Sequence, residues 1–163
     1  VSDTVLQSVP APTTVPIADG DPIARLEIPE IGLDVVVVEG VSVDDLRRGP
    51  GHYPATPLPG QYGNAAIAGH RTTYGAPFNR LDELQKGDFI LTQSLVGESV
   101  YVVSEVLVVA PTDVGVVANT PDEPWLTLTT CNPKWDNYQR LIMHAQLERS
   151  QPRSAGRPAE IGG

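Results

Sequence analysis

The chain has 163 residues, of which 20 are acidic and 11 basic, and its formal net charge is −9. This balance, with no cluster of Lys and Arg, argues against nucleic acid as a partner. A single cysteine excludes an internal disulfide, no Cys/His cluster has the spacing of a structural zinc site, and no apolar run approaches the roughly 18 residues of a membrane-spanning helix.

The two ends of the chain have the composition of tethers. Residues 1–22 carry four prolines among Ser, Thr and Ala, and residues 150–163 have a similar polar character with Gly and Pro. Such compositions stay extended and solvated rather than packing into a core. We therefore expect a flexible N-terminal segment at 1–22, one folded domain at 23–149 and a flexible tail at 150–163.

Between these ends, short β-like segments alternate with breaks rich in Pro and Gly. Their β-branched residues and their alternation predict strands. The seven segments are 23–28, 33–39, 64–69, 89–93, 99–110, 125–131 and 140–148. An eighth strand could lie near His52 and Tyr53, where Pro50 and Pro54 blur the pattern. Helical signal is confined to 42–48 and 77–84. The sequence thus predicts an all-β fold, a closed barrel of seven or eight strands with short helices.

The single cysteine has the setting of a nucleophile. Cys131 ends the predicted strand 125–131, off its leucine face, and an Asn-Pro break follows at once. Arg140 likewise lies off the apolar face of the next strand. The short connection between these strands predicts an antiparallel pair that brings Arg140 beside Cys131. A thiol at a strand end, beside a guanidinium that stays charged, can attack a substrate.

A nucleophilic thiol needs a proton partner, and the chain has three histidines. His70 ends an apolar run and is expected at another strand end, whereas His144 lies inside a strand and His52 lies in a turn that it could cap or brace. Each residue alone has an ordinary explanation, because lone cysteines and histidines are mostly structural and a strand arginine is mostly a surface charge. Together, Cys131, His70 and Arg140 indicate a catalytic site.

These motifs resemble those of the sortases, the cysteine transpeptidases of Gram-positive cell surfaces. Thr-Leu-Thr-Thr-Cys at 127–131 is similar to the family motif Thr-Leu-x-Thr-Cys. His70 follows Ala-Gly and lies 61 positions before Cys131, a separation typical of the family. Arg140, in Gln-Arg-Leu-Ile, resembles the arginine of the family's last strand. The resemblance covers residues 23–149 and implies that His70, Cys131 and Arg140 are catalytic.

Two further segments look most like class E, the housekeeping type of high-GC bacteria. They are Gly-Pro-Gly-His-Tyr-Pro at 49–54 and Gly-His-Arg-Thr-Thr-Tyr-Gly-Ala-Pro-Phe at 69–78. Class E members are similar in carrying a tyrosine shortly after the histidine, which Tyr74 matches. They prefer Leu-Ala-x-Thr-Gly signals over Leu-Pro-x-Thr-Gly signals, and the resemblance implies the same choice here.

The resemblance also implies a reaction. Cys131 attacks the Thr–Gly carbonyl of a sorting signal on a surface protein, and His70 protonates the leaving amine. An amine of peptidoglycan or its precursor, or a pilin lysine, then resolves the thioacyl enzyme with His70 as base. Arg140 would hold the oxyanion or the bound peptide, and Thr130 could add a donor.

The long connection at 111–124 is expected to bind the signal's leucine. It mixes apolar residues with turn formers, as binding loops do, and Val114, Val116 and Val117 could line the pocket. The alternative is a loop that only covers one end of the barrel. The acidic residues Asp82, Glu83 and Asp88 are interpreted as surface charge, so we expect neither a metal nor a cofactor.

The family resemblance implies an ectodomain at the extracellular face of the membrane, held by an N-terminal anchor that is not in this sequence. Papain-like enzymes are disfavoured because they place Cys before His, and the Ser-His-Gly-Cys signature of L,D-transpeptidases is absent. Two alternatives stay open: a pilin-polymerising sortase of another class, and a non-catalytic extracellular β-module with an inert, buried cysteine.

Overall fold

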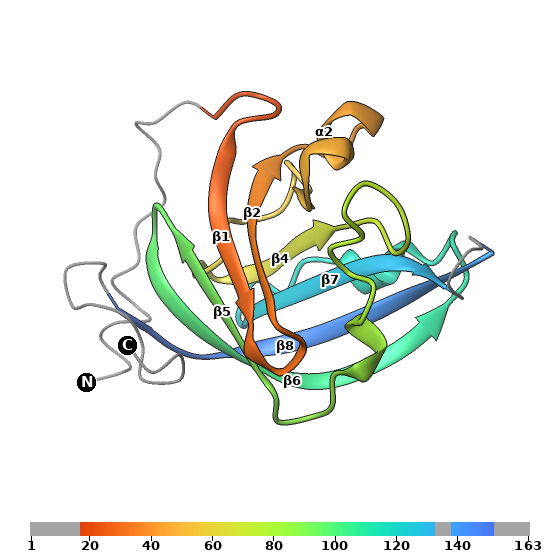
Figure 1. Ribbon diagram of the computed structural model, residues 1–163. Helices are drawn as coiled ribbons and strands as arrows, with labels where there is room; N and C mark the ends of the chain where they lie inside the picture. Colours follow the sequence, from red (N-terminus) through yellow and green to blue (C-terminus); the bar gives the residue numbers. More distant parts are fainter. Residues whose placement is uncertain (1–16, 133–137, 152–163) are drawn as a thin grey trace.

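The computed structural model describes residues 17–132 and 138–151, which form a closed β-barrel (Figure 1). Within these residues there are eight strands: β1 (Pro22–Ile28), β2 (Leu33–Glu39), β3 (Gly51–His52), β4 (Gly63–Ala68), β5 (Phe89–Ser94), β6 (Gly97–Val109), β7 (Pro124–Asn132) and β8 (Gln139–Gln151). Around the barrel they follow the order β1-β2-β3-β4-β7-β8-β6-β5. The predicted barrel is confirmed, and the uncertain eighth strand is the two-residue β3.

The helical elements are short. Helix α2 (Val43–Arg48) begins at Ser42, whose side chain accepts from the Asp45 N–H while the Asp45 carboxylate accepts from the Ser42 N–H. Single 3-10 turns occur at η1 (Pro29–Ile31), η2 (Leu81–Glu83) and η3 (Val114–Val117). The helix predicted at 42–48 is confirmed. The turn expected from Pro77 onward is shortened to η2, and the backbone N–H groups of this segment, such as those of Leu81 and Leu84, donate to carbonyls three residues back rather than four.

Two neighbouring pairings bring distant segments to one edge of the barrel. Strand β4 pairs in parallel with β7, so both strands end at the same edge, and Ala68 lies opposite Thr129. Strand β7 pairs antiparallel with β8, and this ladder runs from Trp125↔Gln146 to Asn132↔Gln139. The end of β4, the end of β7 and the start of β8 therefore lie side by side.

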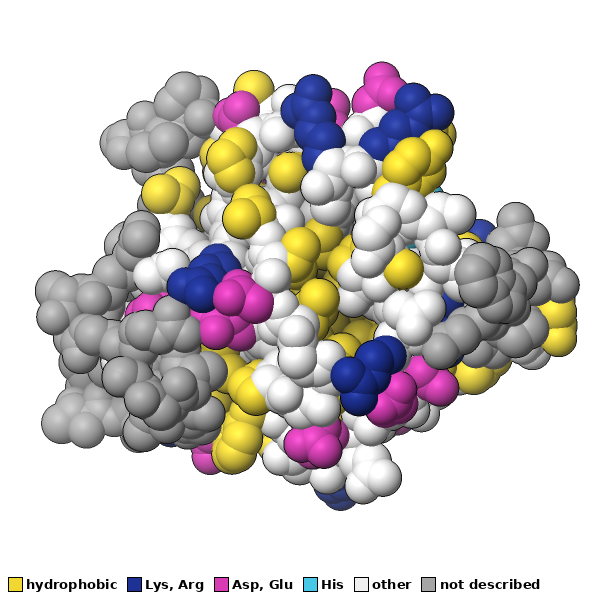
Figure 2. Space-filling view, in the orientation of Figure 1, with side chains coloured by type: hydrophobic (Ala, Val, Ile, Leu, Met, Phe, Trp, Pro, Cys, Tyr) yellow, Lys and Arg dark blue, Asp and Glu magenta, His cyan; other side chains and the backbone are white. Residues whose placement is uncertain are grey.

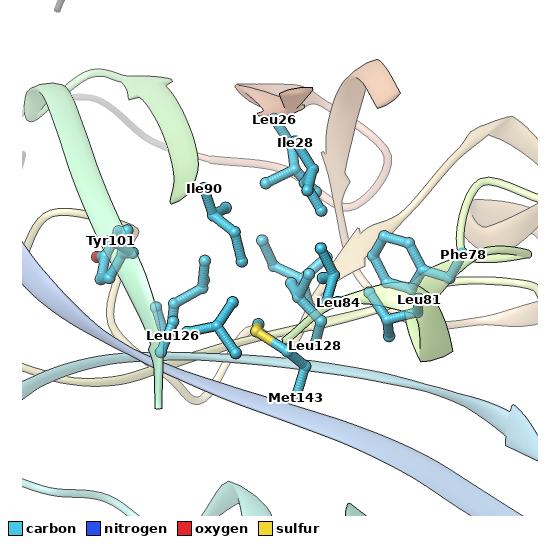
Figure 3. Close-up of a cluster of buried hydrophobic side chains, with 14 of the residues drawn as sticks. Leu26, Ile28, Phe78, Leu81, Leu84, Ile90, Tyr101, Leu126, Leu128 and Met143 are labelled. Atoms are coloured by element: carbon cyan, nitrogen blue, oxygen red, sulfur yellow. The ribbon is translucent and has the colours of Figure 1, made fainter. Parts of the chain in front are cut away.

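The core fills the barrel with side chains from nearly every strand (Figure 3). Leu126 and Leu128 of β7 and Met143 of β8 are fully buried, as their alternation predicts. Phe78 and Leu81, from the segment that follows β4, are also fully buried beside them. Each such side chain contributes about 1.5–3 kcal/mol, so the segment after β4 is firmly anchored to the barrel.

Charge on the molecular surface is mixed. On the face in Figure 2, basic and acidic side chains lie next to one another. Ion pairs among the described residues include Arg25–Asp34 (2.8 Å) and Arg80–Glu83 (2.9 Å). The surface in view therefore carries no basic patch of the kind that binds nucleic acid. Within 17–132 and 138–151, no helix has the length and apolar character needed to cross a bilayer. Most of the two ends expected to be flexible, 1–16 and 152–163, lies outside the described residues.

Candidate active site

Cys131 and Arg140 are direct cross-strand neighbours. Cys131, a free thiol near the end of β7, lies opposite Arg140 of β8 in the antiparallel ladder. Opposed residues of such a ladder project from the same face with their Cβ atoms about 5 Å apart. Both side chains are partly exposed, whereas Thr130 and Leu141, the pair one step inward, are buried. The predicted placement of Arg140 beside Cys131 is confirmed.

His70 reaches the same edge through the parallel pairing. Ala68 lies opposite Thr129, and the Gly69 N–H donates to the Thr129 carbonyl (3.0 Å). Counting two residues onward from Ala68 and from Thr129 places His70 level with Cys131. Residues of β4 and their partners in β7 are 61 positions apart in the sequence, which is also the separation of His70 and Cys131. The structure brings the thiol, the imidazole and the guanidinium to one edge of the barrel.

Tyr74 flanks the histidine. Its ring lies 5.3 Å from that of His70, centroid to centroid, with the planes tilted by 46°. The Arg47 guanidinium of α2 lies 5.6 Å from the centre of the Tyr74 ring, within the range of a cation–π contact. Tyr74 is 55% exposed and has a left-handed backbone with φ of 50°. It is thus an accessible aromatic surface next to the imidazole.

Thr130 is buried at the junction of the two strand ends. Its hydroxyl donates to the Gly69 carbonyl (2.7 Å), and only 3% of the residue is exposed. The bond ties the residue before Cys131 to the residue before His70. In this structure the Thr130 hydroxyl therefore acts on the main chain, and a donor for substrate from this residue would have to come from its backbone.

A cavity of about 150 Å³ opens beside Arg140. It is lined by Tyr53, Val109, Pro111, Asp113, Val116, Val117, Thr129, Arg140 and Ile142. The loop at 111–124 thus contributes Val116 and Val117 to a hollow that it shares with Arg140. The side chain of Val114, the third valine expected there, lies outside what the structure describes. Sites for drug-sized ligands start at about 300 Å³, so this cavity suits one side chain of a peptide.

The other two histidines are internal and hydrogen-bonded. His144 Nδ1 bonds the Thr127 hydroxyl (2.8 Å), and burial lowers the pKa of His144 from its ordinary value. His52 Nδ1 bonds Glu39 (2.6 Å), and its Nε2 bonds the Pro57 carbonyl (2.8 Å). His52 thus braces the turn that follows it, as its position in the sequence suggested. Neither histidine is at the edge that carries Cys131.

Asn64 connects the barrel wall to the 111–124 loop. Its side-chain amide donates to the carbonyls of Val116 (3.3 Å) and Ala118 (3.1 Å), and its oxygen accepts from the Thr127 hydroxyl (2.6 Å). Asn64 is only 1% exposed. A buried amide with three partners fixes the loop in one position relative to β4 and β7.

Two residues of this site were missed at the level of sequence. Arg71 is buried, and its guanidinium donates to the Cys131 carbonyl (2.9 Å). Tyr53 lines the cavity, and its hydroxyl bonds that of Thr129 (3.3 Å). Arg71 follows His70 in the sequence, and Tyr53 follows His52. This adjacency to a histidine is the signal that could have marked them as candidate site residues.

The three acidic residues interpreted as surface charge have partners. Asp82 pairs with Arg71 (3.1 Å), and Glu83 pairs with Arg80 (2.9 Å). Asp88 accepts a backbone hydrogen bond within its own turn (2.8 Å). Among the residues of known placement, no group of three or more His, Cys, Asp or Glu side chains is arranged to hold a metal ion.

Comparison with known proteins identifies the family to which this fold and this site belong. The family model described as sortase domain matches residues 26–148. The chain is 34% identical over 154 residues to sortase SrtE1 of Streptomyces coelicolor, with 85% of the chain and 44% of that protein covered. The chain spans about half the length of the curated relatives it matches.

Solved structures agree with the fold. Sortase E from Streptomyces avermitilis is 36% identical, with a TM-score of 0.80 and coverage of 88% of this chain and 99% of that one. Sortase E1 from Streptomyces coelicolor, solved with a tripeptide in its active site, is 32% identical with a TM-score of 0.82. Its match covers 90% of this chain and 99% of that one.

Proposed function

Because the chain belongs to the sortase family, we propose that it is a cysteine transpeptidase of class E that cleaves a sorting signal between Thr and Gly. One observation supports this most strongly. The register of β4, β7 and β8 puts His70, Cys131 and Arg140 on one edge, next to a cavity that Arg140 shares with the 111–124 loop. A thiol, a proton carrier and a fixed cation beside a side-chain pocket are what acyl transfer from a peptide requires.

In the first half of the reaction, the Cys131 thiolate attacks the carbonyl carbon of the threonine. The oxygen gains negative charge, and the Arg140 guanidinium, which carries several donors, stabilises it from the neighbouring strand. The C–N bond then breaks, and the glycine amine leaves with a proton from the His70 imidazolium. The products are a thioacyl enzyme on Cys131 and the released C-terminal peptide.

In the second half, an amine attacks the thioester. Neutral His70 takes the proton of the incoming amine, the new amide bond forms, and the Cys131 thiolate leaves. We propose an amine of peptidoglycan or its precursor as the acceptor and surface proteins as donors, at the extracellular face of the membrane. The partly exposed positions of His70 and Cys131 leave the acceptor a route from solvent.

Recognition of the signal is assigned to the cavity and its rim. The leucine side chain would enter the hollow that Val116 and Val117 help to line, and Tyr74 would contact the peptide next to His70. The residue after leucine distinguishes Leu-Ala-x-Thr-Gly from Leu-Pro-x-Thr-Gly, and the class E resemblance favours alanine.

Mass spectrometry of the purified chain with both peptides and an amine tests the proposal. We expect cleavage between Thr and Gly, an acyl adduct on Cys131, and faster turnover of Leu-Ala-x-Thr-Gly. The variants Cys131→Ala, His70→Ala and Arg140→Ala should each lose about 10²-fold or more in rate. Arg149→Ala, a partly exposed arginine on the same strand β8, serves as the matched control and should keep the wild-type rate.

Other outcomes would change the assignment. A strong preference for a lysine side-chain amine over a stem-peptide amine would indicate a pilin-polymerising enzyme. No cleavage of either peptide, together with a Cys131 that iodoacetamide does not alkylate in the folded protein, would indicate a non-catalytic β-module.

A further inference from the structure

The residue that follows His70 is a buried cation. Arg71 is only 4% exposed, although burying a guanidinium costs several kcal/mol unless it is fully paired. Its Nη1 donates to the Cys131 carbonyl (2.9 Å), its Nε donates to the Asn79 carbonyl (3.1 Å), and its Nη2 pairs with Asp82 (3.1 Å). The Asn79 amide donates in turn to the Arg71 carbonyl (2.9 Å). One side chain thus joins two parts of the segment after β4 to the end of β7.

Arg71 takes the place of a sheet hydrogen bond. In the parallel ladder, the Gly69 N–H donates to the Thr129 carbonyl. A continued ladder would pair the Arg71 N–H with the Cys131 carbonyl two residues further along. Strand β4 ends at Ala68 instead, and the Arg71 guanidinium supplies the donor to Cys131. The chain therefore leaves the sheet at His70, and the Arg71 guanidinium keeps the end of β7 bonded to the segment that carries His70.

We propose that Arg71 is a positioning residue for the transpeptidation, which holds the Cys131 main chain against the segment that carries His70. The inference rests on the proposed function. Proton transfer between the imidazole and the reacting groups requires contact at hydrogen-bond distance, and a displacement of about 1 Å can cost 10²-fold in rate. Cys131 lies one residue before the end of β7, where ladder bonds on the β4 side have stopped, so its carbonyl needs another anchor.

Anchoring the loop to the barrel is a separate task, which other residues perform. Phe78 and Leu81 are fully buried and hold the segment after β4 in the core. Arg80, in the same segment, pairs with the exposed Glu83 and donates to the Ile31 carbonyl (3.1 Å), away from Cys131. Arg80 is therefore a matched control for Arg71: it has the same side chain in the same loop, without the bond to the nucleophile's main chain.

Steady-state kinetics on Arg71→Met, Arg71→Lys and Arg80→Met, with sorting peptide and amine, test the proposal. We expect Arg71→Met to lower kcat by about 10- to 10²-fold while KM changes less than about twofold, because substrate contacts are intact and only geometry is lost. Arg71→Lys keeps one charged donor and should recover part of the rate. Arg80→Met should match the wild type, and thermal unfolding of each variant shows that it is folded.

A second readout does not depend on activity. Amide hydrogen exchange of the peptide covering 125–132 should be faster in Arg71→Met than in the wild type and unchanged in Arg80→Met. If Arg71→Met raises KM alone, Arg71 contacts substrate and the proposal is wrong. Wild-type kcat and wild-type exchange in that variant would also reject it. If Arg71→Met does not fold, Arg71→Lys decides through the same two measurements.

The two readouts keep this inference apart from the proposed function. If the wild-type chain cleaves no peptide, the proposed function fails, and the exchange of residues 125–132 still reports whether Arg71 holds Cys131. If the wild type is active and neither readout responds to Arg71→Met, the function stands and the positioning role is rejected.

Discussion

At the scale of single residues, Thr130 shows what a buried hydroxyl contributes next to a reactive thiol. Thr130→Val keeps the volume but removes the donor to the Gly69 carbonyl, which is left without this bond inside the protein. We expect a loss of about 1–3 kcal/mol in the free energy of unfolding, measured by urea titration. Thr73→Val, at an exposed position in the following loop, is the control and should change stability little.

His144 makes stability depend on pH. Burial lowers its pKa below the ordinary value of 6.5, so the unfolded chain binds a proton more readily than the folded one. The contribution of neutral His144 to the free energy of unfolding should be fully present above about pH 6.5. It should be lost as the pH drops from there toward the lower pKa of His144 in the folded protein. His144→Gln keeps a donor for Thr127 but cannot titrate.

The free energy of unfolding of the wild type and of His144→Gln is measured by urea titration at about pH 7.5 and about pH 5.5. These values lie about one pH unit either side of the ordinary histidine pKa. The wild type should lose more stability between these pH values than His144→Gln does. Equal losses in both proteins would mean that His144 does not contribute to the pH dependence.

Individual site residues were best predicted from the sequence in strands, where side chains alternate between the two faces. The cross-strand placement of Arg140 beside Cys131 follows from period-two strands and a short connection, and the structure confirms it. Arg71 could not be recognised, because a lone arginine in a loop is usually a surface charge and nothing local shows that its partners include the Cys131 carbonyl. Burial of a charge is a property of the tertiary structure.

At the scale of elements, the Asn64 side-chain amide links η3 and the residue after it to β4. Asn64→Ala removes the donors to the Val116 and Ala118 carbonyls, so η3 loses its side-chain hydrogen bonds to β4. If this loop binds the signal, KM for the sorting peptide should rise about tenfold while kcat changes less, because the cavity wall becomes disordered but the catalytic edge does not.

The control for this prediction lies in the same loop. The Thr120 hydroxyl donates to the Glu123 carbonyl (2.8 Å), which also accepts from the Gly63 N–H at the start of β4 (3.1 Å). Thr120→Val keeps this backbone link to the barrel wall, so it should leave KM unchanged. A lower kcat in Asn64→Ala at constant KM would place the effect at the catalytic edge and contradict the assignment.

Strand positions were predictable, but one pairing was not. Seven of the strands follow from alternation between Pro and Gly breaks, with ends that differ by a few residues from those observed. The parallel contact of β4 with β7 joins segments separated by β5 and β6, and no local pattern encodes such a partner. The turn η3 was also not predicted, because 111–124 was interpreted as a loop and four residues are too few to show a helical periodicity.

At the scale of the whole molecule, the barrel is closed by its shortest strand. Strand β3 contributes two residues, which pair with Val38 and Glu39 on one side and with Ala68 and Ile67 on the other. The His52 side chain reinforces this seam through Glu39 and Pro57, and the pair is almost completely buried. Closure thus depends on a hydrogen-bonded side chain as well as on ladder bonds.

Removing that side chain should weaken the closure. His52→Ala removes the hydrogen bonds to the Glu39 carboxyl and the Pro57 carbonyl, and a buried polar group left without its hydrogen bond costs about 1–3 kcal/mol. Denaturant unfolding should show this loss, and amide exchange should accelerate first in β3 and the adjoining part of β4. His144→Ala, at a buried histidine that bonds the Thr127 hydroxyl and lies away from β3, should cost less and should leave β3 exchange unchanged.

The order of the strands along the chain has a practical consequence. His70 follows β4, while Cys131 and Arg140 belong to β7 and β8, and the hairpin turn between β5 and β6 lies between them with an exposed Leu95. A cut at this turn would give one fragment with the imidazole and another with the thiol and the guanidinium. Neither fragment would hold a complete site. Peptide cleavage recovered on mixing the two fragments would therefore measure how many barrels have reassembled. The protein would then act as a split-enzyme reporter for association of its two halves.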